Sequence, residues 1–229
     1  MTEPLIQVIT PVYNGAAFIG GAIASIQAQT YKNVKITLVD DGSEDDTVNI
    51  IEACAKTDNR ISLIKQRHMG VQFALNAGLR ITTADYVAFL DADDLWHPQK
   101  LEKQIQYLTA GGFEMCFCLM QEFQDSSTVS QLNRHRARAN AMKGYSKSAC
   151  LVRRTAFDKY GLFNEDVAIG DFVEWFSRVL RGNGTVKIID ETLAFRRVHN
   201  NNTMLNADKS SFLRILKAHL DERRNNGET

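Results

Sequence analysis

The sequence predicts an α/β fold, in which a mostly parallel sheet carries helices on both faces. Short hydrophobic stretches alternate with helical stretches through the first half of the chain, an order typical of parallel strands linked by crossover helices. Polar and acidic residues follow several of the hydrophobic stretches, at the strand ends where ligands bind in open sheets of this class. The length of 229 residues suits one large domain or a domain with an appendage.

The first half contains the clearest alternation. Strands are expected where hydrophobic and β-branched residues cluster, at Leu5–Thr10, Val34–Val39, Ile61–Ile64 and Tyr86–Leu90. Helices are expected where hydrophobic residues recur every three or four positions, at Ala17–Gln29, Thr47–Ala55 and Gly70–Arg80. Acids precede the second of these helices, where the helix dipole favours negative charge.

The second half has a less regular pattern. Helices are predicted at Gln99–Ala110 and Asp171–Arg181, the latter with Val173, Phe176 and Leu180 on its inner face. Strands are predicted at Met115–Phe123, Tyr145–Val152, Thr185–Ile189 and Leu193–Arg197. The polar stretch Gln124–Lys143 predicts a loop, and its basic cluster Arg134–Arg138 is either a solvated face or a phosphate or acceptor contact. An amphipathic helix is expected at Lys209–Arg224.

Composition excludes several classes of protein. The formal net charge is zero, which gives no indication of a nucleic-acid or anionic-membrane partner. No apolar run approaches the roughly 18 residues of a membrane span, and the N-terminus does not resemble a signal peptide. The cysteines are interpreted as reduced, structural thiols, and together these features predict a cytoplasmic protein. They are Cys54, Cys116, Cys118 and Cys150.

Three carboxylates crowd the end of the fourth predicted strand. Asp91, Asp93 and Asp94 directly follow Tyr86–Leu90, and their mutual repulsion offers nothing to folding. A divalent cation would relieve that repulsion, because hard ions take oxygen ligands. The alternative is a loop in which aspartates serve as turn and cap residues before the next helix.

Polar side chains at three strand ends are expected to meet along one edge of the sheet. Tyr13 follows the first strand, Asp40 and Asp41 follow the second, and Asp91 and Asp93 follow the fourth. An aromatic ring, a hydrogen-bond acceptor and a metal site in a row suit a nucleotide diphosphate. Neither a Gly-x-Gly-x-x-Gly stretch nor a Gly-Lys-Ser/Thr loop follows the first strand, so a metal is the natural counter-charge.

Three segments in order resemble the signature of glycosyltransferase family 2, whose members are inverting enzymes with a GT-A fold. They are Val8–Gly15, Leu38–Asp45 and Phe89–Trp96. Five further segments agree with the family: Gln66–Arg80, Leu151–Arg154, Gly161–Asn164, Gly170–Trp175 and Arg196–His199. The resemblance covers about residues 5–203. The family's frequent Ala-Arg-Asn is Ala74-Leu-Asn76 in this chain, so one common donor-side arginine is missing.

The resemblance implies a domain organisation and a reaction. One GT-A domain would occupy residues 1–205, with a nucleotide-sugar half at about 1–97 and an acceptor half at about 98–205, before a helix and tail at 206–229. The enzyme would move a sugar from a nucleotide-diphospho-sugar, expected to be a UDP-sugar, to a hydroxyl of a glycan, lipid-linked or other acceptor. Peripheral contact with the inner face of a membrane is compatible with it. The alternatives are a nucleotidyltransferase and an inactive module that binds sugar nucleotides or glycans.

The resemblance also implies the donor-binding residues. Pro11 and Tyr13 would border the nucleobase, with Tyr13 stacking on it, and Asp41 would accept from a base N–H. Asp91 would contact ribose or metal, and Asp93 would be a direct ligand of Mn²⁺ or Mg²⁺. Two of these residues have other interpretations: Tyr13 as a packing aromatic and Asp41 as a cap, a role that Asp40 is expected to have.

Later in the chain, the resemblance implies a catalytic base and a third metal ligand. Asp171 matches the family's general base, and His199 resembles a histidine that completes the metal or diphosphate site. Asp171 would otherwise be a helix N-cap and His199 a plain loop residue. Glu174 is expected to pair with Arg178 rather than to catalyse. Arg196 and Arg197 alternate along a strand, so at most one of them should face the site.

Overall fold

The computed structural model describes residues 3–123, 141–142, 145–167 and 170–199. The basic cluster at 134–138 and the helix expected at 209–224 lie outside these residues. Within the described part of the chain, no helix combines the length and hydropathy needed to cross a membrane.

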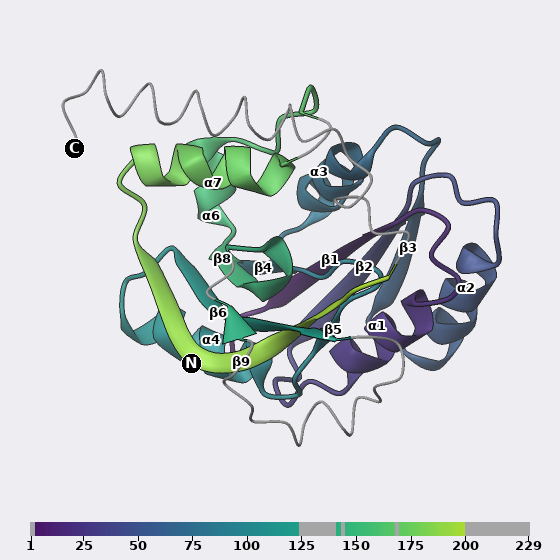
Figure 1. Cartoon of the computed structure of the whole chain (residues 1–229), viewed down its shortest axis with the longest axis horizontal. Coiled ribbons are helices and arrows are strands. Elements are labelled where there is room, and N and C mark those ends of the chain that lie inside the picture. Colours follow the sequence, from purple (N-terminus) through teal and green to yellow (C-terminus); the bar gives the residue numbers. More distant parts are fainter. Residues whose placement is uncertain (1–2, 124–140, 143–144, 168–169, 200–229) are drawn as a thin grey trace.

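One sheet of nine strands forms the centre of the molecule (Figure 1). The strands of the first half pair in parallel: β1 Ile6–Val12, β2 Val34–Asp40, β3 Ile61–Lys65 and β4 Tyr86–Phe89. The strands of the second half are β5 Leu95–Trp96, β6 Met115–Phe123, β7 Ala141–Met142, β8 Cys150–Arg153 and β9 Val186–Arg197. Along the sheet the order is β3-β2-β1-β4-β8-β6-β9-β5, with β7 paired to β6. Only β6 and β9 are parallel in this half, so the sheet is mixed there.

Helices cover both faces of the sheet, as predicted. In Figure 1, α3, α6 and α7 lie on one side and α1, α2 and α4 on the other. Their bounds are α1 Ile19–Gln27, α2 Thr47–Thr57, α3 Val71–Ile81, α4 Lys100–Ala110, α6 Thr155–Tyr160 and α7 Asp171–Arg181. A short 3₁₀ turn, η2 at Lys147–Ala149, precedes β8.

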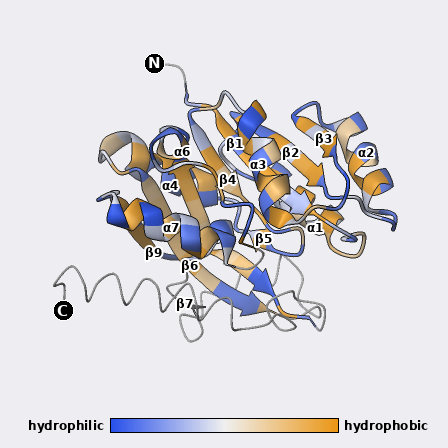
Figure 2. Cartoon of the chain, turned by 90° about the horizontal axis from the view of Figure 1, so that it is seen from above, coloured by the Kyte–Doolittle hydropathy of each residue, from blue (hydrophilic) through white to orange (hydrophobic). Residues whose placement is uncertain are grey.

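The core lies between the sheet and these two helix layers. Every residue of β1 is buried, as expected for a central strand that is covered on both faces. Figure 2 shows the same contrast, with hydrophobic colour on the central strands and hydrophilic colour on many connecting loops. On one face, Gly78 lets α3 approach the sheet closely, because a Cβ atom there would lie 2.7 Å from Ile9 Cγ2.

The strand predicted at Tyr145–Val152 is wrong in its first half. Residues 147–149 form η2, and the strand begins only at Cys150. Side-chain and backbone groups of the turn bind elsewhere: the Ser148 hydroxyl contacts Asp91, and the Ser148 carbonyl accepts from Trp96 Nε1 at 2.7 Å. The residues before Cys150 therefore form a turn bound to the loop after β4 rather than a strand paired in the sheet.

The inner face predicted for α7 is correct at Phe176 but wrong at Leu180. Its buried hydrophobic residues are Phe172, Trp175, Phe176 and Val179, whereas Leu180 is 44% exposed. The helix is rotated because Trp175 turns inward to stack on Phe157 and to donate from Nε1 to the Gly161 carbonyl at 2.7 Å. The large ring and its buried hydrogen bond outweigh the burial of one leucine.

The last two predicted strands form one strand, β9. The register between β6 and β9 shifts on both sides of Leu119, and this irregularity accommodates the polar residues Asp190 and Glu191 without ending the strand. The helix α6 and the two-residue strand β5 were not predicted, because both are shorter than the periodic patterns that identify helices and strands.

Candidate functional site

The predicted convergence of strand ends is present in the structure. β1 pairs with β2 so that Val12 lies opposite Asp40, and β1 pairs with β4 so that Ile9 lies opposite Phe89. The residues that follow β1, β2 and β4 therefore leave the sheet at one edge. These are the segments that contain Tyr13, Asp41 and Asp91.

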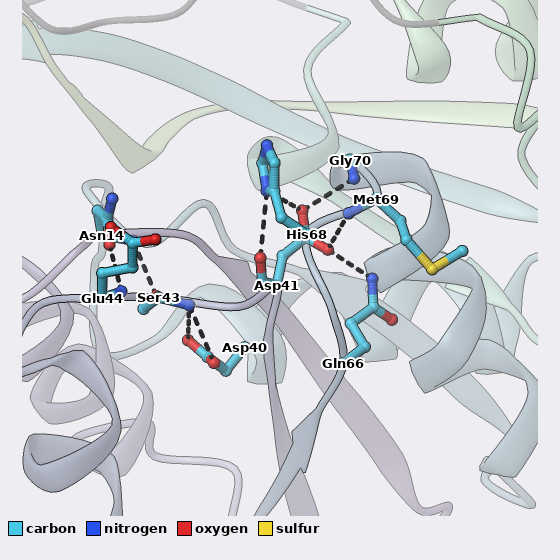
Figure 3. A network of polar contacts seen from close by, with 9 residues as sticks. All are labelled: Asn14, Asp40, Asp41, Ser43, Glu44, Gln66, His68, Met69 and Gly70. Atoms are coloured by element: carbon cyan, nitrogen blue, oxygen red, sulfur yellow. Dashed lines mark hydrogen bonds and ion pairs between the residues drawn. The ribbon is translucent and has the colours of Figure 1, made fainter.

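Asp41 is the centre of a polar network at this edge (Figure 3). Its Oδ1 accepts from the Met69 backbone N–H at 2.9 Å and from Gln66 Nε2 at 2.6 Å. Its Oδ2 accepts from the Gly70 backbone N–H at 2.8 Å and lies 2.9 Å from His68 Nδ1. Asp41 is only 3% exposed. Its carboxylate holds residues 66–70 beside the end of β2 through these hydrogen bonds.

Tyr13 and His68 form a stacked pair beside this network. Their ring centroids lie 4.0 Å apart with an interplanar angle of 25°, and 45% of Tyr13 is exposed. Gly42 allows the loop to close: its φ is +81°, and a Cβ there would lie 2.8 Å from the His68 backbone nitrogen. Tyr13 thus presents an aromatic face to solvent, whereas the neighbouring Pro11 is buried within β1.

Asp40 has the capping role that was expected of it. Its carboxylate accepts from the Ser43 backbone N–H, at 3.2 Å to Oδ2. Asn14 holds the same loop from the other side, since its backbone N–H donates to Ser43 Oγ and its side-chain oxygen accepts from the Glu44 N–H (Figure 3). The two adjacent aspartates therefore differ: Asp40 closes its own turn, and Asp41 binds the segment that follows β3.

The three carboxylates after β4 point to three different partners. Asp94 is buried and accepts from the Arg197 backbone N–H at 3.1 Å. Burial, and then the charges of Asp91 and Asp93, raise the pKa of Asp94 well above its ordinary value. Asp94 thus fastens β9 to the loop rather than facing a ligand.

Asp93 meets the end of β9. His199 Nε2 lies 3.0 Å from Asp93 Oδ2, and the His199 ring stacks on Phe18 at 4.6 Å. Arg197 donates from Nε to the Asp93 carbonyl, whereas Arg196 points outward to Glu122. This agrees with the prediction that at most one of these arginines faces the site.

Asp91 is held by the η2 turn. Lys147 Nζ lies 3.1 Å from Asp91 Oδ1, and Ser148 Oγ lies 3.3 Å from Asp91 Oδ2. Burial lowers the pKa of Lys147, but the carboxylates of Asp171, Asp91 and Asp94 raise it, and the net shift is upward. The lysine therefore stays charged among the acids of both halves of the chain.

Asp171 is the first residue of α7 and is 7% exposed. Its Oδ2 is buried and has no hydrogen-bond partner within the described residues. The residue in the N-cap position is Gly170, with a φ of +83°, and no side-chain capping hydrogen bond is found at this helix end within the described ranges. Glu174 pairs with Arg178 at 2.9 Å, as predicted. The geometry thus gives no support to a capping role for Asp171, and one of its oxygens remains available to accept a proton.

The residues present fit a divalent ion only in combination with other ligands. Within the described ranges, no three side chains of His, Cys, Asp or Glu form a ready-made metal-binding group. Asp93 and His199 lie close enough together to share an ion, whereas both Asp91 oxygens already have protein contacts. Mg²⁺ and similar ions often take one or two carboxylates together with substrate phosphates, and this donor set suits that mode.

Several site residues were not predicted individually from the sequence. Lys147 and Ser148 lie in a segment that was expected to be a strand, and no motif marks them. Gln66 and Gly70 belong to a segment noted for its family resemblance, but their bonds to Asp41 were not foreseen. The available signal was Gly70, because a glycine at the start of a helix often marks a backbone conformation that other residues avoid. In the structure Gly70 has a φ of +116°.

Comparison with known sequences gives consistent matches. The profile described as "Glycosyl transferase family 2" matches residues 7–169. An uncharacterized glycosyltransferase of Haemophilus influenzae is 30% identical over 218 residues, which cover 87% of this chain and 67% of the relative. A second glycosyltransferase from that organism, also uncharacterized, is 36% identical over 124 residues, 51% of this chain and 50% of the relative. The chain therefore spans about half to two thirds of these curated relatives.

Comparison with solved structures gives the fold. S. aureus TarS in complex with UDP-GlcNAc aligns with a TM-score of 0.77 and 16% identity, over 94% of this chain and 65% of that one. The mannosyltransferase PcManGT from Pyrobaculum calidifontis, in complex with GDP-Man and Mn²⁺, aligns with a TM-score of 0.76 and 20% identity, over 98% of this chain and 65% of that one. At these identities the likeness is one of fold.

Proposed function

This chain belongs to glycosyl transferase family 2 and is a glycosyltransferase of the GT-A fold, and we propose that it inverts the anomeric carbon of a nucleotide-diphospho-sugar with Asp171 as the base. The observation that carries this proposal is the Oδ2 atom of Asp171, which is buried and has no hydrogen-bond partner among the described residues. A carboxylate without a hydrogen-bond partner is poised to accept a proton from an acceptor hydroxyl.

The donor's base binds at the edge formed by β1 and β2 in this proposal. The exposed face of Tyr13 suits a stacked nucleobase, and Asp41 is the nearby acceptor for a base N–H. Both Asp41 oxygens already accept hydrogen bonds from backbone N–H groups of the 66–70 segment. A nucleobase N–H would therefore donate to an oxygen that also accepts from this segment. Uracil is the expected base, and the structural neighbours bind both UDP-GlcNAc and GDP-Man.

Asp93 and His199 would hold Mn²⁺ or Mg²⁺ beside the diphosphate of the donor, and Asp91 would contact ribose or metal. A bound divalent ion supplies charge stabilisation for the departing diphosphate. Support comes from the 3.0 Å approach of His199 to Asp93 and from the Mn²⁺ bound by PcManGT. An imidazole ligand suits Mn²⁺ better than Mg²⁺, so Mn²⁺ is the expected partner of His199.

The chain's own residues account for the transfer step. Asp171 takes the proton of the acceptor hydroxyl, and that oxygen attacks the anomeric carbon on the face opposite the diphosphate. The new carbon–oxygen bond forms as the bond to the diphosphate oxygen breaks, so one carboxylate suffices and the anomeric configuration inverts. Asp171 lies in the first turn of α7, where the helix dipole stabilises negative charge.

The two halves of the chain would divide the substrates. Residues 1–97 would bind the nucleotide sugar, and residues 98–205 would bind the acceptor, a hydroxyl of a glycan, lipid-linked or other molecule. The reaction would take place in a reducing cytoplasm, since all four cysteines are free thiols.

A donor panel tests the proposal. UDP-GlcNAc, UDP-glucose, UDP-galactose and GDP-mannose are each added to the protein with Mn²⁺, and nucleoside diphosphate release is measured with water and with a mixture of simple glycan acceptors. We expect one donor to give release that EDTA abolishes, and the product anomer to be opposite to that of the donor. Release of pyrophosphate from a nucleotide triphosphate, with none from any sugar nucleotide, would indicate a nucleotidyltransferase instead.

A further inference from the structure

The most exposed aromatic side chain in the described part of the chain is that of Tyr145, at 52%. Tyr145 lies two residues before η2, the turn whose Ser148 hydroxyl contacts Asp91. The short segment from Tyr145 to Ser148 therefore ends against the acids that follow β4. Packing covers only part of the Tyr145 ring, and the rest of its surface is open to a ligand.

Two buried aromatic residues hold the Tyr145 ring in one orientation. The ring stacks on that of Phe176 in α7, with centroids 4.9 Å apart and an interplanar angle of 28°. It also meets the ring of Phe117 in β6 edge-to-face, at 5.3 Å. Because one face of Tyr145 lies on Phe176, the opposite face is the one left to solvent. The fold thus fixes a flat aromatic surface in advance, which lowers the entropy lost on binding.

The same two buried rings connect Tyr145 to the proposed base. Phe172 follows Asp171 directly in α7. The Phe172 ring lies 6.1 Å from that of Phe117 and 6.1 Å from that of Phe176. Tyr145 and Phe172 therefore share two ring neighbours. Residues 171 and 176 are five positions apart on one helix, a rise of about 7.5 Å. Tyr145 thus lies beside the first turns of the helix that begins with Asp171.

The sheet register places this aromatic cluster at the edge where the donor acids lie. Leu151 of β8 pairs with Ala88 of β4 on one side and with Cys116 of β6 on the other. Phe117 is the next residue of β6, so it is level with Phe89, the last residue of β4. Since the ring of Tyr145 packs on Phe117, it lies at the end of β4 from which the site acids follow.

An open aromatic face close to carboxylates suits a sugar. One face of a pyranose ring carries several C–H groups, and these are attracted to the negative face of an aromatic ring. The hydroxyls around the pyranose ring need hydrogen-bond partners, and ionised carboxylates such as those of Asp91 and Asp171 accept from them. A lipid chain would instead leave these polar groups without partners, which is costly. The combination therefore favours a glycan over a lipid chain.

We propose that Tyr145 binds the acceptor, and that the acceptor is a glycan whose pyranose ring stacks on the open face of Tyr145 with a hydroxyl close to Asp171. This inference rests on the proposed function, in which Asp171 takes the proton of that hydroxyl. Tyr145 takes no part in the proton transfer. A ring contact together with a hydrogen bond fixes both the position and the orientation of the sugar, as an in-line attack requires.

Three variants test the role of the ring. Tyr145→Leu keeps an apolar cover over Phe117 and Phe176 but removes the flat face, whereas Tyr145→Phe keeps that face. The control is Tyr107→Leu, because Tyr107 is also exposed, at 40%, and lies on α4, on the other side of the sheet (Figure 1). The probes are the methyl glycosides of glucose, galactose, mannose and N-acetylglucosamine, in both anomeric forms. Their affinities are measured by saturation-transfer NMR with UDP and Mn²⁺ present.

We expect at least one glycoside to bind the wild type, and Tyr145→Leu to weaken that binding by about 10-fold. Tyr145→Phe and Tyr107→Leu should stay within about threefold of the wild type. The UDP affinity of all three variants, measured by calorimetry, should match that of the wild type.

Four results would overturn the inference. One is equal glycoside affinity of the wild type and Tyr145→Leu, and another is binding of none of these glycosides to the wild type. A lower Tm of Tyr145→Leu with unchanged glycoside affinity would leave the ring only a packing role. An equal loss of UDP affinity in Tyr145→Leu would assign the ring to the donor instead.

Glycoside binding and sugar transfer separate failure of this inference from failure of the proposed function. Loss of transfer in Asp171→Asn, with normal glycoside binding by Tyr145→Leu, would refute the glycan site and leave the base assignment intact. Normal transfer by Asp171→Asn, with glycoside binding lost in Tyr145→Leu, would refute the base assignment and leave the glycan site.

Discussion

His199 Nε2 lies 3.0 Å from Asp93 Oδ2, although the two residues are 106 positions apart in the sequence. The contact joins the loop after β4 to the end of β9, and it assembles the pair to which the proposed metal site is assigned. Arg197 strengthens the same junction, because it donates to the Asp93 carbonyl and its backbone binds Asp94.

The first prediction concerns this pair. Asp93→Ala and His199→Ala should each weaken UDP binding at least about 10-fold when Mn²⁺ is present, the lower end of the cost of disturbing a metal site. In EDTA, both variants should bind UDP as weakly as the wild type, because the shared ion is gone. Calorimetry checks both conditions, with Asp158→Ala, an exposed acid paired with Arg154, as the control. Equal UDP affinity of the wild type in Mn²⁺ and in EDTA would refute the metal site.

The second prediction concerns Asp171. Asp171→Asn keeps the shape of the side chain but removes its basicity, so transfer should fall by about 10²- to 10⁴-fold. UDP affinity and Tm should stay close to those of the wild type, because Asp171 caps nothing and its Oδ2 has no partner among the described residues. Steady-state kinetics, calorimetry and thermal unfolding check the three quantities. Glu174→Gln is the matched control on the same helix.

The third prediction distinguishes the two aspartates after β2. Asp41→Asn should weaken UDP binding by roughly 1–3 kcal/mol, the range for a hydrogen bond to a charged group. It should also lower the Tm, since Met69 and Gly70 donate to different carboxylate oxygens, and the amide nitrogen that replaces one of these oxygens cannot accept a hydrogen bond. Asp40→Asn should change UDP affinity little, because its carboxylate binds the Ser43 backbone. The reverse order of effects in calorimetry would assign the base contact to Asp40.

The fourth prediction is a pH dependence of stability caused by Lys100, which is fully buried against Gln104 and the Cys150 carbonyl. Burial lowers the pKa of Lys100 from 10.5 to about 8. The unfolded chain therefore holds more protons between these two values, and the free energy of unfolding should rise with pH across that window. The penalty of the buried charge is complete below the folded pKa and is relieved as the ammonium loses its proton.

Lys100→Met removes this penalty. Below pH about 8 the free energy of unfolding of the variant should exceed that of the wild type by up to about 3 kcal/mol. Loss of the hydrogen bond to Gln104 should reduce this gain by roughly 1 kcal/mol. Urea unfolding at about pH 7 and about pH 9.5 should show the difference shrinking at the higher value. Lys56→Met, at an exposed position on α2, should show no such change. A constant difference between wild type and Lys100→Met would mean that Lys100 does not titrate in this range.

The fifth prediction tests the orientation of α7. Trp175→Ala should cost about 3–5 kcal/mol, the usual loss for a fully buried tryptophan. Leu180→Ala should cost less than about 0.5 kcal/mol, because Leu180 is largely at the surface. Chemical unfolding measures both, and a large effect at Leu180 would restore the inner face predicted from the sequence.

The sequence by itself determined the local features of this protein. Hydrophobic periodicity identified β1 to β4 and most helices, because each pattern lies within one continuous segment. Strand-end chemistry identified Tyr13, Asp41, Asp91 and Asp93 as neighbours, because parallel strands end at the same edge. These inferences needed only the spacing of residues along the chain and the rule that strands joined by crossover connections run parallel and end at the same edge of the sheet.

Only the tertiary structure decided which distant groups meet. The contact of His199 with Asp93 depends on how β9 pairs with β5 and β6, and the contact of Lys147 with Asp91 depends on how η2 packs against β4. The inward turn of Trp175 depends likewise on the space beside Phe157. None of these outcomes follows from local periodicity, because each is set by packing between segments that approach one another only after the sheet has formed. The acids of the site are therefore a local property of the sequence, and the cations placed among them are a property of the fold.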